Sequence, residues 1–181
     1  MNFAPTPLAG SYEITLKPRE DNRGWFARFF CKDEFQQIGH TKECVQMNQS
    51  HTNKKGAVRG MHYQHPPHGE IKLVRCISGA VLDVIVDLRE GSQTFLQWFA
   101  TELAASKKNM LYIPAGFAHG FQTLTEDCEL IYLHSEYYVP GSEGGIKYND
   151  PTININWPLS VTELSERDSN LQNINNNFKG I

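Results

Sequence analysis

A histidine and a lysine lie in two neighbouring strand-like segments of this sequence, in Arg59-Gly60-Met61-His62 and in Lys72-Leu73-Val74. Imidazole accepts a proton near neutral pH, and an ammonium group stabilises a developing oxyanion. Removal of a proton from a carbon beside a carbonyl group needs both functions, because the electron pair collects on the carbonyl oxygen as an enolate. The pair therefore indicates carbanion chemistry without a cofactor, although each residue taken singly also fits an ordinary packed or solvated role.

The segments around these residues have the composition of short β-strands separated by turns. Glycines and a Pro-Ala-Gly run supply the turn signals. The clearest strand carries Asp83 and Asp87 on one face of a β-branched run, near the expected core. Predicted strands cover residues 12–16, 25–30, 45–50, 58–63, 71–78, 80–88, 95–101, 110–113, 119–124 and 130–135. The pattern predicts an all-β sandwich or barrel.

Helical signals are few and peripheral. Residues 33–39 have an acidic start and a glycine stop, and residues 160–167 are long enough for one or two helical turns. The asparagine-rich tail over residues 170–181 has little apolar pattern, which favours a surface strap or a frayed end.

The composition predicts one globular domain over residues 1–181, since 40% of the residues are apolar and 11% are aromatic. A net charge of −3 and a pI near 6.2 argue against a nucleic-acid partner. No apolar run approaches the roughly 20 residues that span a bilayer, and a signal-peptide pattern is lacking. We therefore expect no membrane partner and a cytoplasmic location. The four cysteines, Cys31, Cys44, Cys76 and Cys128, form no Cys-x-x-Cys pair and are expected to be buried free thiols.

A second histidine, His119, follows a turn in Pro114-Ala115-Gly116-Phe117-Ala118-His119. In metal-binding members of the cupin superfamily, such a Pro-x-Gly-x-x-His motif joins two earlier histidines that stand one residue apart. Here His62 is followed by Gln64, a poor metal ligand, while His65 would point to the opposite face of a strand. We therefore expect no metal, and a metal-dependent cupin enzyme is the alternative.

An ordered set of motifs runs over most of the chain. The motifs are Asp21-x-Arg23-Gly24-x-Phe26, Gln46-x-Asn48-x-Ser50, Arg59-Gly60-x-His62-x-Gln64, Lys72-Leu73-Val74, Gly79-x-Val81-x-Asp83-Val84-x-Val86-Asp87, Ile113-Pro114-x-Gly116-Phe117-Ala118-His119-Gly120-Phe121, Tyr132, Tyr138-x-Pro140, Asn149-Asp150-Pro151, Ile155-x-Trp157-Pro158 and Leu164-Ser165-x-x-Asp168. Together they resemble the dTDP-4-dehydrorhamnose 3,5-epimerase family. The resemblance implies a cupin-type β jelly roll with a few short peripheral helices. It also implies a cofactor-free epimerase of a nucleotide-diphosphate-linked 4-keto-6-deoxyhexose, acting in a deoxysugar pathway.

The resemblance implies four catalytic residues. His62 is the base that removes the proton beside the 4-keto group, and Asp168 holds the imidazole in one tautomer and stabilises its cation. Lys72 stabilises the enolate oxygen. Tyr132 returns a proton from the opposite face, a role that suits a phenol with a pKa of about 10.

The resemblance also implies residues that bind the substrate. Arg23 and Arg59 are expected to hold the diphosphate, because guanidinium groups match phosphate oxygens in a bidentate manner. Phe26 and Tyr138 are expected to pack against the base or the sugar. Surface ion pairing and core packing are the ordinary alternatives for these arginines and aromatics. Further polar groups around the sugar are expected from Gln46, Asn48 and His119.

Three positions depart from the family pattern. Arg28 stands where the family has a glutamate that meets the nucleotide. A carboxylate accepts a hydrogen bond from thymine N3–H, which a guanidinium does not, whereas cytosine presents an acceptor at N3. Arg28 is thus a candidate base-binding residue that suits cytosine better than thymine, and the nucleotide carrier, dTDP or CDP, is open. Leu96 replaces a glycine and Glu70 a glutamine, and both changes are expected to reshape the sugar pocket.

Several alternatives are open at this stage. The sequence does not distinguish epimerisation at C3, at C5 or at both, and some relatives isomerise the keto group instead. A non-catalytic module that binds a sugar nucleotide is another interpretation. The resemblance further implies a homodimer in which the N-terminal strands, with Arg23 and Phe26, reach the partner's pocket.

Overall fold

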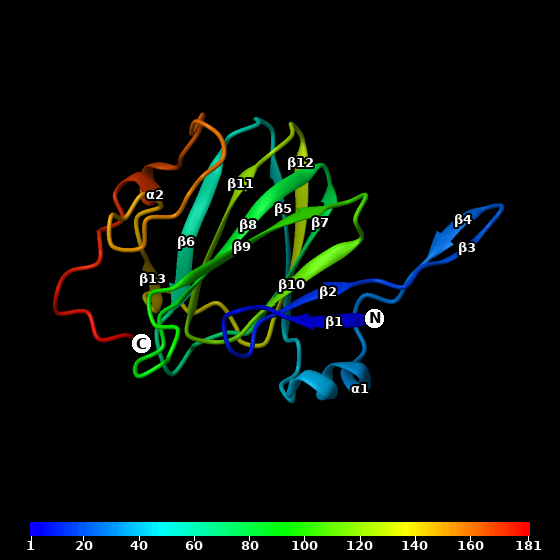
Figure 1. Ribbon diagram of the computed structural model, residues 1–181, viewed down its shortest axis with the longest axis horizontal. Coiled ribbons are helices and arrows are strands. Elements are labelled where there is room, and N and C mark those ends of the chain that lie inside the picture. Colours follow the sequence, from blue (N-terminus) through cyan, green and yellow to red (C-terminus); the bar gives the residue numbers. More distant parts are fainter.

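Two β-sheets with antiparallel pairing lie face to face in the computed structural model, which describes all 181 residues (Figure 1). The six-stranded sheet has the order β1 (Asn2–Pro5), β2 (Tyr12–Thr15), β10 (Asn109–Ile113), β7 (Lys72–Ser78), β12 (Cys128–His134) and β5 (Gln46–Thr52). The five-stranded sheet has the order β13 (Glu143–Gly145), β6 (Val58–Gln64), β11 (Phe117–Thr123), β8 (Ala80–Asp87) and β9 (Trp98–Ala104). The two sheets, with their non-sequential strand order, confirm the predicted all-β jelly roll.

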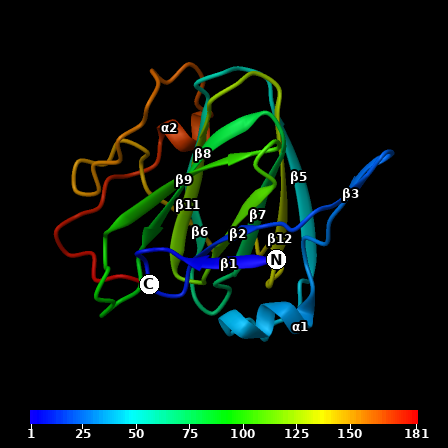
Figure 2. The same cartoon turned by 45° about the vertical axis from the view of Figure 1, so that its right-hand side comes forward.

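Three small elements lie outside the sandwich. A hairpin of β3 (Arg19–Asp21) and β4 (Gly24–Phe26) projects away from the body of the protein (Figures 1 and 2). The helix α1 (Lys32–Phe35) continues into a 3-10 helix, η1 (Gln36–Ile38). The helix α2 (Glu166–Ser169) is a single turn near the C-terminal end. Short peripheral helices are thus confirmed.

The space between the sheets is filled largely by apolar side chains, because alternate residues of each strand point inward. Val74, Leu111 and Leu130 from the six-stranded sheet belong to the same buried cluster as Val81 and Ile85 from the five-stranded sheet. A second cluster covers the outer face of the six-stranded sheet with α1, and a third covers the outer face of the five-stranded sheet with C-terminal segments. This core fixes the distance between the sheets.

The C-terminal tail forms the predicted surface strap. Ile174, Phe178 and Ile181 pack against the cluster on the outer face of the five-stranded sheet. The backbone N–H of Ile181 donates to the carbonyl oxygen of Leu88 at 2.8 Å, which fastens the end of the strap. The four cysteines are free thiols, but only Cys76 and Cys128 are buried as predicted, whereas Cys31 and Cys44 are partly exposed.

Most predicted strands match the observed ones to within two residues, and the larger differences have local causes. The strand predicted over residues 95–101 begins only at Trp98, because residues 93–96 form a turn in which Leu96 has a φ of 61°. Leu96 therefore adopts a left-handed conformation that a glycine adopts without strain, and its packing against the core offsets that cost. The strand predicted over residues 25–30 ends at Phe26.

The prediction of a helix over residues 160–167 is wrong in position, since the observed helix α2 spans Glu166–Ser169. Residues 160–165 are not helical, and the single turn of α2 begins after Ser165, whose side chain accepts from the backbone N–H of Asp168 at 3.0 Å. This N-cap fixes the start of the helix later than composition alone indicates. The strands β1, β3 and β13 were not predicted, because segments of three or four residues carry too little alternation to be recognised.

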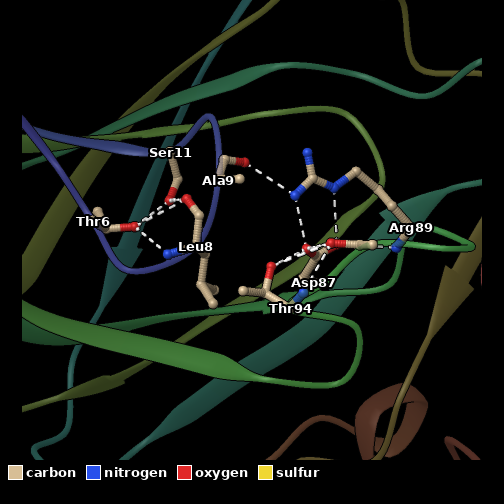
Figure 3. A network of polar contacts seen from close by, with 8 residues as sticks. Thr6, Leu8, Ala9, Ser11, Asp87, Arg89 and Thr94 are labelled. Carbon is tan, nitrogen blue, oxygen red and sulfur yellow. Dashed lines mark hydrogen bonds and ion pairs between the residues drawn. The ribbon is translucent and has the colours of Figure 1, made fainter.

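A buried carboxylate at the end of β8, Asp87, fastens the N-terminal loop to the sandwich (Figure 3). It accepts hydrogen bonds from Arg89 Nε and Nη2 at 2.9 and 2.7 Å and from the Ser92 and Thr94 hydroxyls, both at 2.6 Å. Arg89 also donates to the carbonyl oxygen of Ala9 at 3.0 Å. Burial by itself raises the pKa of Asp87, but these donors outweigh it and lower the pKa to about 2.

Asp87→Asn removes the charge at the centre of this network and nearly preserves its shape. We expect the free energy of unfolding at about pH 7 to fall by about 3 kcal/mol, because a buried charged pair is broken. The pKa of Asp87 is about 2 in the folded protein, below its ordinary value of 3.8, so ionisation stabilises the folded state above that ordinary value. This contribution is lost as the pH falls through the folded pKa.

Urea unfolding at several pH values measures the effect, and the difference between the two proteins is expected to shrink in acid. Glu126→Gln, at an exposed position, is the matched control. Equal destabilisation by both substitutions, or a difference that does not change with pH, would contradict the assignment.

Candidate active site

A cavity of about 880 Å³ opens between the two sheets. Its walls come from both sheets and from the segment that leads into α2. Seven of the predicted site residues line it: His62, Lys72, Tyr132, Asp168, Asn48, Arg59 and His119. The structure thus brings together residues that are spread over more than half of the sequence.

Strand register places the two histidines of the cavity next to each other. His62 on β6 is the cross-strand partner of His119 on β11. The two strands approach closely beside this pair, since a Cβ atom added to Gly60 would lie 2.5 Å from the Cα of Gly120. A glycine is therefore required in the Arg-Gly-x-His motif for the strands to pair in this way.

His62 forms a pair with Asp168. The Nε2 atom of His62 lies 2.6 Å from Oδ1 of Asp168, while Oδ2 accepts from the backbone N–H of Gly60 at 3.1 Å. Burial raises the pKa of Asp168, but the hydrogen bond and charge of His62, the backbone N–H of Gly60 and the Ser165 side chain outweigh it and lower the pKa. The carboxylate therefore stays ionised and accepts a hydrogen bond from the Nε2–H group of His62. This leaves Nδ1 of the neutral imidazole free to accept a proton.

Lys72 contributes an ammonium group to the same cavity. Its Nζ atom lies 3.0 Å from Oε1 of Glu70 and 3.5 Å from the carbonyl oxygen of His62. The side chain of Lys72 is only 10% exposed, so the charge is held in a largely desolvated position. An ammonium in such a site interacts strongly with negative charge that develops nearby.

Tyr132 faces the cavity from the opposite sheet. Its hydroxyl lies 2.8 Å from the hydroxyl of Ser50 on the neighbouring strand β5. Burial raises the pKa of Tyr132 to about 12, against the smaller lowering effect of the Ser50 hydrogen bond. The phenol is therefore protonated at neutral pH and is able to give a proton to a strong base such as a carbanion.

Two further polar residues of the cavity are fixed by their own partners. The Nε2 atom of His119 lies 2.9 Å from Oδ2 of Asp83, which is fully buried on β8. Arg59 donates from Nε to the hydroxyl of Thr52 at 2.9 Å and from Nη2 to the carbonyl oxygen of His51 at 3.0 Å. The guanidinium is thereby held at the cavity wall.

Three predicted binding residues do not reach the cavity of their own chain. Arg23 and Phe26 belong to the projecting hairpin, and their exposed fractions are 85% for the Arg23 side chain and 75% for Phe26. Arg23 forms an ion pair with Asp21 at 2.6 Å. Arg28, just after the hairpin, donates to Glu34 at 3.1 Å. Within one chain, therefore, these residues do not complete the site.

Gln46 and Tyr138 lie next to the cavity without lining it. The backbone N–H of Tyr138 donates to Oε1 of Gln46 at 3.1 Å, and Gln46 in turn donates to Asn48 at 3.3 Å. The Tyr138 hydroxyl donates to Glu143 at 2.8 Å, and Arg167 forms an ion pair with the same carboxylate at 3.0 Å.

The cavity residues that received no role in the sequence analysis include Ser50, His134 and Arg167. A signal was available for the first two, because Ser50 and His134 each follow a predicted site residue by two positions on a strand. Residues two apart on a strand share a face. Arg167 precedes Asp168 and had no comparable signal.

The chain contains no group of three or more His, Cys, Asp or Glu side chains arranged to hold a metal ion. Gln64, at the position of a ligand in metal-binding cupins, instead fastens a loop. Its amide nitrogen donates to the carbonyl oxygens of His68 and Tyr137, both at 3.1 Å, and its oxygen accepts from Val139 N–H at 2.9 Å. None of the helices has the length and apolar character that a membrane crossing requires.

Comparison with known proteins gives consistent matches over nearly the whole chain. The profile of the family described as dTDP-4-dehydrorhamnose 3,5-epimerase matches residues 5–176. The dTDP-4-dehydrorhamnose 3,5-epimerase of Shigella flexneri is 43% identical over 173 residues, which are 95% of each chain. The dTDP-4-dehydrorhamnose 3-epimerase of Streptomyces niveus is 38% identical over 169 residues, 93% of this chain and 81% of that one.

A solved structure agrees with these sequence matches. The dTDP-6-deoxy-D-glucose-3,5-epimerase of Legionella pneumophila, in complex with dTDP-4-keto-L-rhamnose, aligns with a TM-score of 0.90 at 38% identity. The alignment covers 95% of this chain and 92% of that chain. The shared fold is the cupin jelly roll. By its sequence, its fold and the ordered motifs around the cavity, this chain belongs to the dTDP-4-dehydrorhamnose 3,5-epimerase family.

Proposed function

We propose that this protein is a cofactor-independent epimerase that inverts C3 and C5 of a thymidine-diphosphate-linked 4-keto-6-deoxyhexose in deoxysugar biosynthesis. One observation carries the proposal: a histidine paired with a carboxylate faces a tyrosine across a cavity between two sheets. His62 belongs to the five-stranded sheet, and Tyr132 belongs to the six-stranded sheet. Inversion requires this arrangement, since the proton must leave one face of the ring and return to the other.

The first step is proton abstraction by His62. The free Nδ1 atom takes a proton from the carbon beside the 4-keto group, and the electron pair of the C–H bond moves onto the keto oxygen to form an enolate. Asp168 stabilises the imidazolium that results, because its carboxylate lies 2.6 Å from Nε2. The ammonium of Lys72 stabilises the enolate oxygen.

The second step is protonation from the opposite face by Tyr132. The enolate collapses to the ketone as its carbon takes the phenolic proton, so the configuration of that carbon is inverted. The Ser50 hydroxyl, 2.8 Å from the phenolic oxygen, donates to the phenolate that is left. Transfer of protons between solvent and the two residues then restores the resting enzyme.

The carrier is proposed to be thymidine diphosphate, as in the ligand of the Legionella pneumophila relative. The family membership supports this carrier. The cytidine alternative rested on Arg28, whose guanidinium is already engaged by Glu34 at 3.1 Å. For the diphosphate, Arg59 offers a fixed guanidinium at the cavity wall. Inversion at both carbons is supported by the Shigella flexneri relative, which is named a 3,5-epimerase.

The decisive experiment is proton NMR of dTDP-4-keto-6-deoxyglucose with the protein in deuterium oxide. The wild-type protein is expected to remove the C3 and C5 proton signals, and His62→Ala to slow this exchange by about 10³-fold because it lacks the base. Thymidine diphosphate binding, followed by calorimetry, controls for the folding of the variant. The cytidine-linked sugar is expected to react more slowly.

Each other outcome of this experiment points to a different function. Exchange at C3 alone would make the protein a 3-epimerase, the activity in the name of the Streptomyces niveus relative. Faster exchange with the cytidine sugar would overturn the thymidine carrier. Nucleotide binding without any exchange would identify a binding module and overturn the proposal.

Tyr132→Phe separates the two steps of the mechanism. The variant retains His62, so we expect solvent deuterium still to enter the substrate while inversion slows by about 10²-fold to 10⁴-fold. The returning deuteron then comes from the original face. Proton NMR measures exchange, and the coupling constants of the recovered sugar report its configuration. Unchanged inversion by this variant would show that another group is the acid.

A homodimer is the second part of the proposal. The hairpin of β3 and β4 exposes Trp25 and Phe26 and extends away from its own chain (Figure 1). A projecting hairpin that exposes two aromatic side chains suits a contact with a second copy. We propose that the hairpin brings Arg23 and Phe26 to the partner's cavity. The cytoplasmic location predicted from the sequence stays a prediction.

Mixing two inactive variants tests this arrangement. Arg23→Ala and His62→Ala are each expected to be nearly inactive alone. If Arg23 acts across the dimer, refolding them together restores roughly a quarter of the wild-type activity, because half of the dimers are mixed and each has one intact site. No recovery, with mixed dimers confirmed by mass spectrometry, would show that Arg23 does not act across the dimer.

A further inference from the structure

A glutamate and a histidine surround the lysine of the cavity. Oε1 of Glu70 lies 3.0 Å from Nζ of Lys72, and Oε2 lies 2.6 Å from Nδ1 of His134. The exposed side-chain fractions are 12% for Glu70, 10% for Lys72 and 9% for His134. One carboxylate therefore bridges two largely buried nitrogen groups.

Strand geometry brings these three residues together. Lys72 and His134 are directly opposite each other in the pairing of β7 with β12. Glu70 precedes Lys72 by two residues, just before β7 begins, so an extended chain directs both side chains to the same side. The contact is thus a consequence of sheet register.

The hydrogen bonds around this carboxylate form a continuous chain with consistent donors. The Nδ2 amide of Asn48 donates to Nε2 of His134 at 3.2 Å, so the histidine carries its proton on Nδ1 and donates it to Glu70. Asn48 in turn accepts from Gln46 at 3.3 Å. The imidazole is therefore neutral, and the opposite charges of Glu70 and Lys72 balance.

Glu70 is the carboxylate available to Lys72. Each of the other carboxylates near the cavity has its own partner: Asp168 pairs with His62, Asp83 with His119 and Glu163 with Lys54. Burial raises the pKa of Glu70, but the His134 hydrogen bond and the charge of Lys72 outweigh it and lower the pKa. The remaining ionisable side chains that line the cavity itself are Tyr132, Arg59, Glu163 and Arg167.

An unpaired ammonium in such a desolvated place loses its proton readily. Of the three donors of the Lys72 ammonium, one is directed to Glu70 and one to the His62 carbonyl oxygen, which leaves one for a ligand in the cavity. The Glu70 carboxylate therefore directs the Lys72 ammonium and places a negative charge beside it.

We propose that Glu70 and His134 are positioning residues for Lys72. Glu70 keeps the lysine charged and directed into the cavity, and His134, fixed by Asn48, holds the carboxylate in place. The inference rests on the proposed function, in which Lys72 stabilises an enolate.

Glu70→Gln tests the proposal, because it removes the charge with little change of shape. We expect kcat to fall by about tenfold and KM to change by less than about threefold, since enolate stabilisation rather than ground-state binding is weakened. The loss is partial because the amide oxygen of the new glutamine still accepts from the Lys72 ammonium, in keeping with the glutamine that the family pattern has at this position. The basic limb of the pH profile is expected to move to lower pH by about one unit or more, because the lysine loses its proton earlier.

Two further variants complete the experiment. His134→Phe keeps a ring beside Tyr132 but removes the hydrogen bonds, and we expect a smaller loss of kcat with a shift of the profile in the same direction. If Glu70→Gln does not fold, the kcat and pH profile of His134→Phe test the proposal instead. Glu102→Gln breaks a surface pair with Lys107 and is the matched control, with no expected change. Folded Glu70→Gln or His134→Phe protein with a wild-type kcat and pH profile would overturn the proposal.

A substrate-free measurement separates this proposal from the proposed function. Lysine labelled with ¹³C at Cε gives a Lys72 signal, which its loss in Lys72→Arg identifies. In Glu70→Gln, this signal is expected to titrate at lower pH than in the wild-type protein. The same titration in both proteins would overturn the positioning role, whereas a wild-type protein without exchange activity would overturn only the proposed function.

Discussion

Buried carboxylates organise this protein, because each must be neutralised or hydrogen-bonded when folding removes it from water. Asp87 is satisfied by a network that holds the N-terminal loop. Asp168 is satisfied by His62, and Asp83 is satisfied in part by His119. The contacts that compensate for burial therefore also fix the histidines of the cavity. Stability and the geometry of the site thus depend on the same interactions.

The apolar core and the reactive cavity share the same strands. On β7, Val74 belongs to the core while Lys72, two residues earlier, faces the cavity. On β12, Leu130 belongs to the core and Tyr132 lines the cavity. Because these side chains lie on paired strands rather than on loops, their separation is set by the packing of the sandwich. The proposed base and acid therefore occupy opposite walls of the cavity.

The three positions that the sequence analysis expects to depart from the family pattern are each accommodated by a local partner. Leu96 adopts the left-handed conformation of a glycine and packs against the core. Arg28 forms an ion pair with Glu34. Glu70 replaces a glutamine and joins Lys72 to His134. The first departure changes a turn, the second lies outside the cavity of its own chain, and the third adds a charge beside the proposed enolate site.

The sequence by itself determined the fold class and the family, because strand alternation and the order of the motifs can be recognised from local residue patterns. It also selected His62 and the other cavity residues through those motifs. The tertiary structure decided which of them meet: Asp168 reaches His62 from the far end of the chain, Glu70 bridges to His134, and the hairpin with Arg23 leaves the sandwich. Such contacts depend on which strands become neighbours and in which register. Register follows from the packing of the whole chain, so no local pattern contains it.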